Sequence, residues 1–90
     1  MIDFKKVREI VNEHIKIAVG DIEEEEPKII FAVRDKPPFE TKEVWRVTVK
    51  YTPKPKKETE VVVGEQQALF KIDAETGEVL EFKEGFSWKA

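Results

Sequence analysis

The sequence contains no cysteine and only one histidine, one methionine and one serine among its 90 residues. Without cysteine, the chain can form neither a disulfide nor a thiolate metal site. The scarcity of serine and histidine leaves few candidates for a nucleophile or a general base. No apolar run approaches the ~20 residues that a membrane-spanning helix needs. We therefore expect a protein that is not an enzyme, holds no cofactor and does not enter a membrane.

The amino-terminal segment MIDFKKVREI lacks the charged-then-apolar pattern of a signal peptide, which predicts a cytoplasmic location. Charged residues, mostly Glu and Lys, make up 39% of the sequence, against about 25% in an average protein. Abundant Glu and Lys with few thermolabile side chains is typical of hyperthermophilic proteins, so we expect a thermophilic, archaeal source. The formal net charge of −3 does not indicate a nucleic-acid partner, because nucleic-acid-binding domains are usually basic.

A chain of this length is expected to form a single domain over residues 1–90. A chain of this size buries only about 60–65% of the surface that its unfolded form exposes. Hydrophobic residues make up 40% of the sequence, which is enough for one thin core and argues against disorder.

Residues 3–19 predict a helix, because their apolar side chains recur with a period of 3.6 residues. Asp3 can cap the first turn, and Gly20 can end the helix in a left-handed conformation. The apolar stripe consists of Phe4, Val7, Ile10, Val11, Ile15 and Ala18. His14 falls within this stripe, and we interpret it as a half-buried residue at the boundary between helix and sheet.

An acidic run at residues 21–26 has five carboxylates in six positions. Mutual repulsion favours a solvated loop there. A cation site is the alternative, since hard cations bind several carboxylate oxygens, but the run lacks the internal glycine and alternate spacing of a calcium loop. No metal site is therefore expected, although the sequence leaves open whether the run binds cations.

Four segments predict β-strands: residues 28–34, 44–52, 61–72 and 78–83. The third is either one long strand or two pieces hinged at Gly64, where a bulge is plausible. Short connections favour the pairing of strands that follow one another in the chain. We predict an α+β fold, with one amino-terminal helix packed on a four-stranded antiparallel meander whose other face is polar and solvent-exposed.

Alternation along each strand assigns side chains to one face or the other. The expected rows are Ile29, Phe31 and Val33 in the first strand, Trp45, Val47, Val49 and Tyr51 in the second, Ala68, Phe70 and Ile72 in the third, and Leu80 and Phe82 in the fourth.

Residues 73–78, DAETGE, predict a tight turn between the last two strands. Asp73 can bond to the backbone two residues on, and Gly77 can supply the positive φ that closes the turn. A strand followed by Asp-Ala-Glu-Thr-Gly-Glu-Val resembles the closing hairpin of PepSY domains. That resemblance implies a helix on an antiparallel sheet in the broad cystatin-like manner. It also implies an inhibitory or regulatory role like that of peptidase propeptides, and it carries over no catalytic residues.

A second resemblance rests on the strand Trp-Arg-Val-Thr-Val at residues 45–49, the proline-containing break after it, and the later strand ending in Asp-x-x-x-Gly. This arrangement is similar to the carboxy-terminal part of gas vesicle protein O. That family ends in a segment rich in tyrosine and arginine, whereas this chain ends in GFSWKA.

We interpret the chain as a small binding or assembly module that acts through protein–protein contacts. One candidate is a sheet edge formed by Val61, Val62 and Val63, which could instead be an ordinary buried strand. The other is the aromatic tail with Phe86 and Trp88, which could fold over its own sheet or cap a second subunit. A homodimer with twofold symmetry is the expected assembly, with another protein as the alternative partner.

A small-molecule site in a cleft between helix and sheet is the alternative function, with Trp45, Tyr51, Phe70 and His14 as its candidate residues. So small a domain also needs those aromatic side chains for its core. Binding of single-stranded nucleic acid would need aromatic and cationic side chains on one face of the sheet. Alternation places Trp45 and Tyr51 opposite the cations of the same strand, so no nucleic-acid partner is expected.

Overall fold

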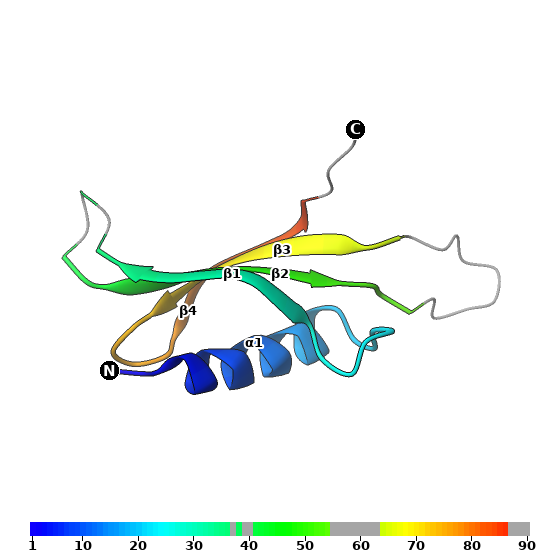
Figure 1. Ribbon diagram of the computed structural model, residues 1–90, viewed down its shortest axis with the longest axis horizontal. Helices are drawn as coiled ribbons and strands as arrows, with labels where there is room; N and C mark the ends of the chain where they lie inside the picture. Colours follow the sequence, from blue (N-terminus) through cyan, green and yellow to red (C-terminus); the bar gives the residue numbers. More distant parts are fainter. Residues whose placement is uncertain (37, 39–40, 55–63, 87–90) are drawn as a thin grey trace.

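One helix and four strands make up the fold, in a computed structural model that describes residues 1–36, 38, 41–54 and 64–86 (Figure 1). The elements are α1 (Phe4–Ala18), β1 (Lys28–Asp35), β2 (Val44–Tyr51), β3 (Gln66–Asp73) and β4 (Val79–Phe86). The strands form one antiparallel sheet in the order β1-β2-β3-β4. Helix α1 lies along one face of this sheet. The predicted α+β meander with an amino-terminal helix is confirmed.

Helix α1 begins and ends where its sequence predicts. The Asp3 carboxylate accepts a hydrogen bond of 2.9 Å from the Lys6 backbone N–H, which satisfies one of the free donors of the first turn. At the other end, the chain leaves the helix through Gly20, whose φ of 97° is a conformation that glycine adopts without strain. The helix buries one residue per turn against the sheet, namely Val7, Val11 and Ile15.

The hydrophobic core lies between α1 and the two central strands. Strand β2 contributes Val47, Val49 and Tyr51, and strand β3 contributes Ala68, Phe70 and Ile72. The register places Val47 opposite Phe70 and Val49 opposite Ala68, so the apolar rows of both strands face the same side. The rows predicted for these two strands are confirmed, with Trp45 at the partly buried end of the first.

A bulge in β1 makes the expected row of Ile29, Phe31 and Val33 wrong. Ile29 pairs with Val49 and Phe31 pairs with Thr48, so Ile30 is an extra residue between them. An extra residue reverses the alternation of faces beyond it. Ile29 therefore packs against the core, whereas Phe31 lies on the opposite face and is 53% exposed.

A second bulge, at Leu80 in β4, separates the expected pair of Leu80 and Phe82. Ile72 pairs with Val79 and Lys71 pairs with Glu81, which leaves Leu80 as the extra residue. Val79 and Phe82 consequently pack against the core, and Leu80 is exposed.

The predicted turn between β3 and β4 forms around Asp73. One carboxylate oxygen accepts hydrogen bonds from the backbone N–H groups of Glu75, at 2.8 Å, and Thr76, at 3.2 Å. Gly77 has a φ of 81°, and its N–H donates to the Asp73 carbonyl at 2.9 Å. A Cβ on Gly77 would lie 3.0 Å from Ile10 Cδ1, so this glycine also permits the hairpin to approach α1 closely.

Candidate protein-interaction surface

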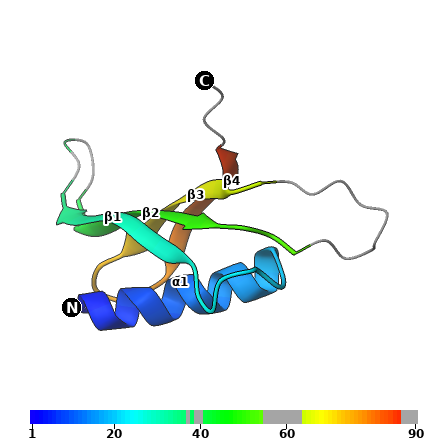
Figure 2. The ribbon, with the colours of Figure 1, turned by 45° about the vertical axis from the view of Figure 1, so that its right-hand side comes forward.

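One face of the sheet carries no covering element among the described residues. Helix α1 packs on the opposite face, and Figure 2 shows the four strands lying to one side of it. We call the uncovered side the open face. An uncovered sheet face usually carries polar side chains that contact water. Apolar residues exposed on such a face therefore indicate an interaction site.

The open face carries a row of four paired residues across the sheet, two of them apolar, which we call the apolar row. Phe31, Thr48, Leu69 and Lys83 pair in this order across all four strands. Phe31 is 53% exposed and Leu69 is 36% exposed. A shallow hollow of about 220 Å³ lies over this row. The sequence predicted a polar, solvent-exposed face here unless something covers it, and the β1 bulge is one reason that Phe31 departs from this prediction.

Charged side chains in ion pairs lie beside the apolar row and at its Lys83 end. The pairs are Arg46 with Asp35 at 2.5 Å, Lys83 with Glu81 at 3.2 Å, and Lys50 with Glu65 at 3.5 Å. Exposed pairs of this kind each contribute only ~0–1 kcal/mol to folding. An apolar centre with a polar rim is the usual anatomy of a protein–protein interface.

The residues predicted for a ligand cleft do not all come together. Tyr51 and Phe70 are buried in the core beneath α1. The His14 ring lies 5.3 Å from the Phe70 ring, edge to face, and 4.6 Å from the Phe82 ring. This cluster places His14 at the boundary between helix and sheet, as its position in the apolar stripe predicts.

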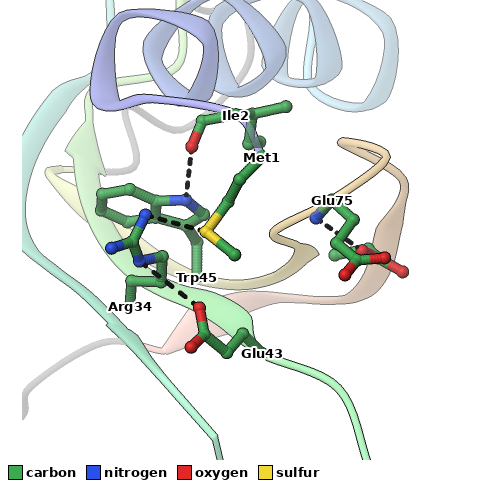
Figure 3. A network of polar contacts seen from close by, with 7 residues as sticks. Met1, Ile2, Arg34, Glu43, Trp45 and Glu75 are labelled. Atoms are coloured by element: carbon green, nitrogen blue, oxygen red, sulfur yellow. Dashed lines mark hydrogen bonds and ion pairs between the residues drawn. The ribbon is translucent and has the colours of Figure 1, made fainter.

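Trp45 belongs to a separate cluster that attaches the start of the chain to the sheet (Figure 3). Its indole N–H donates to the Ile2 carbonyl at 3.4 Å. Arg34 reaches Met1 Sδ at 3.0 Å and Glu43 Oε2 at 3.6 Å, with its guanidinium carbon 6.0 Å from the Trp45 ring centre. All of these contacts join elements of the same molecule, so the cluster has a structural role.

The Tyr51 hydroxyl is buried and has no hydrogen-bond partner among the described residues. Burial raises the pKa of Tyr51 to about 12, and the negative charge of Glu84 adds to the effect. The phenol therefore stays neutral at physiological pH.

Two carboxylates of the acidic run stabilise the loop that carries them. Glu24 accepts hydrogen bonds from the Thr52 backbone N–H at 2.8 Å and from the Thr52 hydroxyl at 3.0 Å. Burial would raise the pKa of Glu24, but these hydrogen bonds and one from its own backbone outweigh burial and lower the pKa. The described residues contain no group of three or more His, Cys, Asp or Glu arranged to hold a metal ion.

Glu26 joins the same loop to α1. It accepts hydrogen bonds from Arg8 at 2.7 Å and from Asn12 at 3.0 Å. Those bonds, and then the charge of Arg8, lower the pKa of Glu26.

Several predicted interaction residues lie outside the described part of the chain. These are Val61, Val62, Val63 and Trp88. The backbone of Phe86 ends β4 opposite Gln67, but its side chain is also outside the description. Within the described residues, no helix has the length and apolar character needed to cross a membrane.

Phe31 and Leu69 are the surface residues that the sequence prediction missed. The signal for Phe31 is the run IIFAV at residues 29–33, which is continuously apolar where a half-buried strand would alternate, and the signal for Leu69 is its place between the core residues Ala68 and Phe70. Such a run indicates apolar residues on both faces of its strand.

Residues 1–83 match the family model described as PepSY, "Peptidase propeptide and YPEB domain". The match covers the helix, the first three strands and most of the last strand. No curated protein and no solved structure matches the chain significantly. These comparisons give no support to the resemblance to gas vesicle protein O.

Proposed function

The chain belongs to the PepSY family, and from this premise we propose that it is a non-enzymatic protein-binding module whose contact surface is the open face of its sheet. PepSY domains are generally regulatory or inhibitory modules that interact with proteins. An inhibitory or regulatory role towards a peptidase is the specific form of the proposal. The observation that carries it is that the two apolar residues of this row, Phe31 and Leu69, are both exposed.

The physical argument for this surface is its position on a rigid scaffold. Phe31 and Leu69 project from paired strands whose opposite face is fixed by the core, so little conformational entropy is lost when a partner covers them. Aromatic side chains on such a surface supply large contact areas. The ion pairs around the row can exchange partners at the rim of a complex.

The tail residues Phe86 and Trp88 and the segment Val61, Val62 and Val63 remain candidates for the same interface. In the sequence they stand before β3 and at or after the end of β4. A homodimer also remains part of the proposal, with another protein as the alternative partner.

A small-molecule site between helix and sheet is the second candidate function. The buried Tyr51 hydroxyl without a described partner favours it, because a polar ligand atom could satisfy that group. Screening for ligands that raise the thermal unfolding midpoint checks this candidate. If no compound shifts the midpoint of the wild-type protein more than that of a Tyr51→Phe variant, the candidate fails.

The cytoplasmic location and the thermophilic, archaeal source stay predictions from composition. Proteins with PepSY domains are often extracellular, so the location needs a direct measurement. Fractionation of source cells followed by immunodetection would overturn the prediction if the protein were found outside the cytoplasm.

Site-specific photo-crosslinking tests the proposed surface. A photoreactive phenylalanine analogue replaces Phe31 in one variant and Ile17 in the other. Ile17 is a matched control, since it is 80% exposed on α1, across the sheet from the open face. After irradiation in an extract of the source organism, we expect adducts from position 31 that excess unmodified protein suppresses. Equal labelling from both positions, or no specific adduct at position 31, would contradict the proposal.

A further inference from the structure

The two edges of the sheet differ in how far they resist pairing with another strand. The β4 edge carries the charges of Glu81, Lys83 and Glu84 and has two irregularities in its register. Charges and bulges are the usual protection of an exposed edge. Strand β1 has one irregularity, at Ile30, and no charge between Lys28 and Arg34. The β1 edge is therefore the less protected of the two.

Apolar side chains accompany the β1 edge on both faces of the sheet. Phe31 is exposed on the open face, and Ile30 is 43% exposed at the bulge. On the helix side, a hollow of about 460 Å³ lies beside the strand, with Phe4, Pro27 and Ile29 among its lining residues. An added strand would gain side-chain contacts above and below in addition to backbone hydrogen bonds.

The charges that flank β1 indicate which strand fits. Glu25 lies in the acidic run before the strand, and Lys36 directly follows it. Both are exposed, and neither forms an ion pair with any described residue. When two copies of one strand pair antiparallel about a twofold axis, the start of each lies beside the end of the other. The acidic segment of one copy would then approach Lys36 of the second.

We infer that β1 pairs antiparallel with β1 of a second copy of this chain, which joins the two sheets into one continuous sheet of eight strands. This inference rests on the proposed function, because it gives the homodimer a defined interface. The open faces of the two copies lie on the same side of the joined sheet. The two Phe31 side chains would come close to the axis and extend one apolar surface across both copies.

Sedimentation equilibrium of the full chain and three lysine variants tests the inference. Ile30→Lys introduces a charge at the β1 edge, which meets its own copy near the twofold axis. Leu69→Lys introduces a charge at the centre of the open face, and Leu80→Lys introduces one on the β4 edge, both away from the twofold axis. Leu80 is a matched control for Ile30, because it is also a bulge residue of an edge strand and is 44% exposed.

We expect a wild-type dimer whose dissociation constant rises by about tenfold or more in Ile30→Lys, since each tenfold change reflects ~1.4 kcal/mol. Leu69→Lys and Leu80→Lys should dissociate like the wild type. Urea unfolding of each variant shows that it is folded. A monomeric wild type at the highest attainable concentration overturns the inference, as does a dimer that Leu69→Lys or Leu80→Lys weakens and Ile30→Lys leaves intact.

A charge swap gives a second test that does not alter the apolar edge. Lys36→Glu should weaken the dimer, and Glu25→Lys combined with Lys36→Glu in one chain should restore it. Failure of the double variant to recover wild-type affinity contradicts the proposed orientation. A monomer that still forms the crosslinks from position 31 would disprove the dimer and leave the proposed function standing.

Discussion

At the scale of single residues, Asp73 fixes the turn that closes the sheet. It is 2% exposed, and its carboxylate accepts from two backbone N–H groups while Lys42 Nζ lies 3.7 Å away. The hydrogen bonds from Glu75 and Thr76 lower the pKa of Asp73 below its ordinary value of 3.8, with a smaller contribution from Lys42. The ionised form is therefore the one that stabilises the folded protein.

We predict that Asp73→Asn lowers the free energy of unfolding at neutral pH and that this loss shrinks in acid. The folded pKa lies below the unfolded one, so the stabilisation is complete above pH 3.8 and disappears as the pH falls through the folded value. Urea titrations of both proteins, at neutral pH and in acid, measure the difference. Asp21→Asn serves as a control, because Asp21 is exposed. Equal pH profiles for the two variants would contradict the assignment.

At the scale of secondary-structure elements, α1 shows how burial along one stripe holds a helix to a sheet. Ile15 is 1% exposed and belongs to the core, whereas Ile17, two residues further on and therefore on the opposite side of the helix, is 80% exposed. The helix has no acidic residue in its first turn, and its only cationic residue in the last turn is Lys16. Packing of the stripe is therefore the main source of its stability.

We predict that Ile15→Ala lowers the free energy of unfolding by ~2–5 kcal/mol, because it removes buried methylene groups and leaves a cavity. Ile17→Ala makes the same chemical change on the same helix at an exposed site. It should change stability by less than about 0.5 kcal/mol. Urea unfolding monitored by circular dichroism measures both values. Similar losses in the two variants would show that α1 does not pack as described.

The strands show how far the fold could be predicted from the sequence. Strands β2 and β3 alternate cleanly, so their core rows were predicted correctly from Val47, Val49, Phe70 and Ile72. The bulges in β1 and β4 could not be found in this way. Ile30 and Leu80 each have an apolar neighbour, and two adjacent apolar residues do not show which of them faces the core. Only the pairing of β1 with β2, and of β4 with β3, shows which residue is the unpaired bulge residue.

The candidate surface was missed for the same reason. Alternation placed Phe31 with Ile29, and the bulge between them places it on the open face beside Thr48. Leu69 stands between core residues of β3, where alternation correctly turns it outward. Its pairing with Phe31 through Thr48 depends on strand order and register, which a single sequence does not specify.

At the scale of the whole molecule, the described ion pairs are mostly separate contacts. They include Lys6 with Glu9, Arg8 with Glu26 and Arg34 with Glu43, and no residue in them is shared with another described ion pair. Networks of ion pairs stabilise proteins at high temperature more reliably than isolated pairs do. The described pairs are therefore weak support for a thermophilic source, which continues to rest on composition.

We predict a thermal unfolding midpoint above the ~45–65 °C range of mesophilic domains, since the sequence is rich in Glu and Lys and poor in thermolabile residues. Differential scanning calorimetry at a fixed protein concentration measures the midpoint. The Ile30→Lys variant provides a control in which dimerisation contributes less to the midpoint. A midpoint within the mesophilic range would contradict the predicted thermophilic source.

The contact between the start of the chain and the closing hairpin affects how the protein is made. The Ile2 N–H donates to the Ala74 carbonyl at 2.7 Å, and Ile10 lies against Gly77. During synthesis α1 leaves the ribosome well before Ala74 and Gly77, which lie far along the chain. Contacts so distant in sequence form only after a large loop has closed, which slows folding. Ile2 and Ile10 therefore lack their partners in the closing hairpin on the nascent chain until Ala74 and Gly77 have emerged.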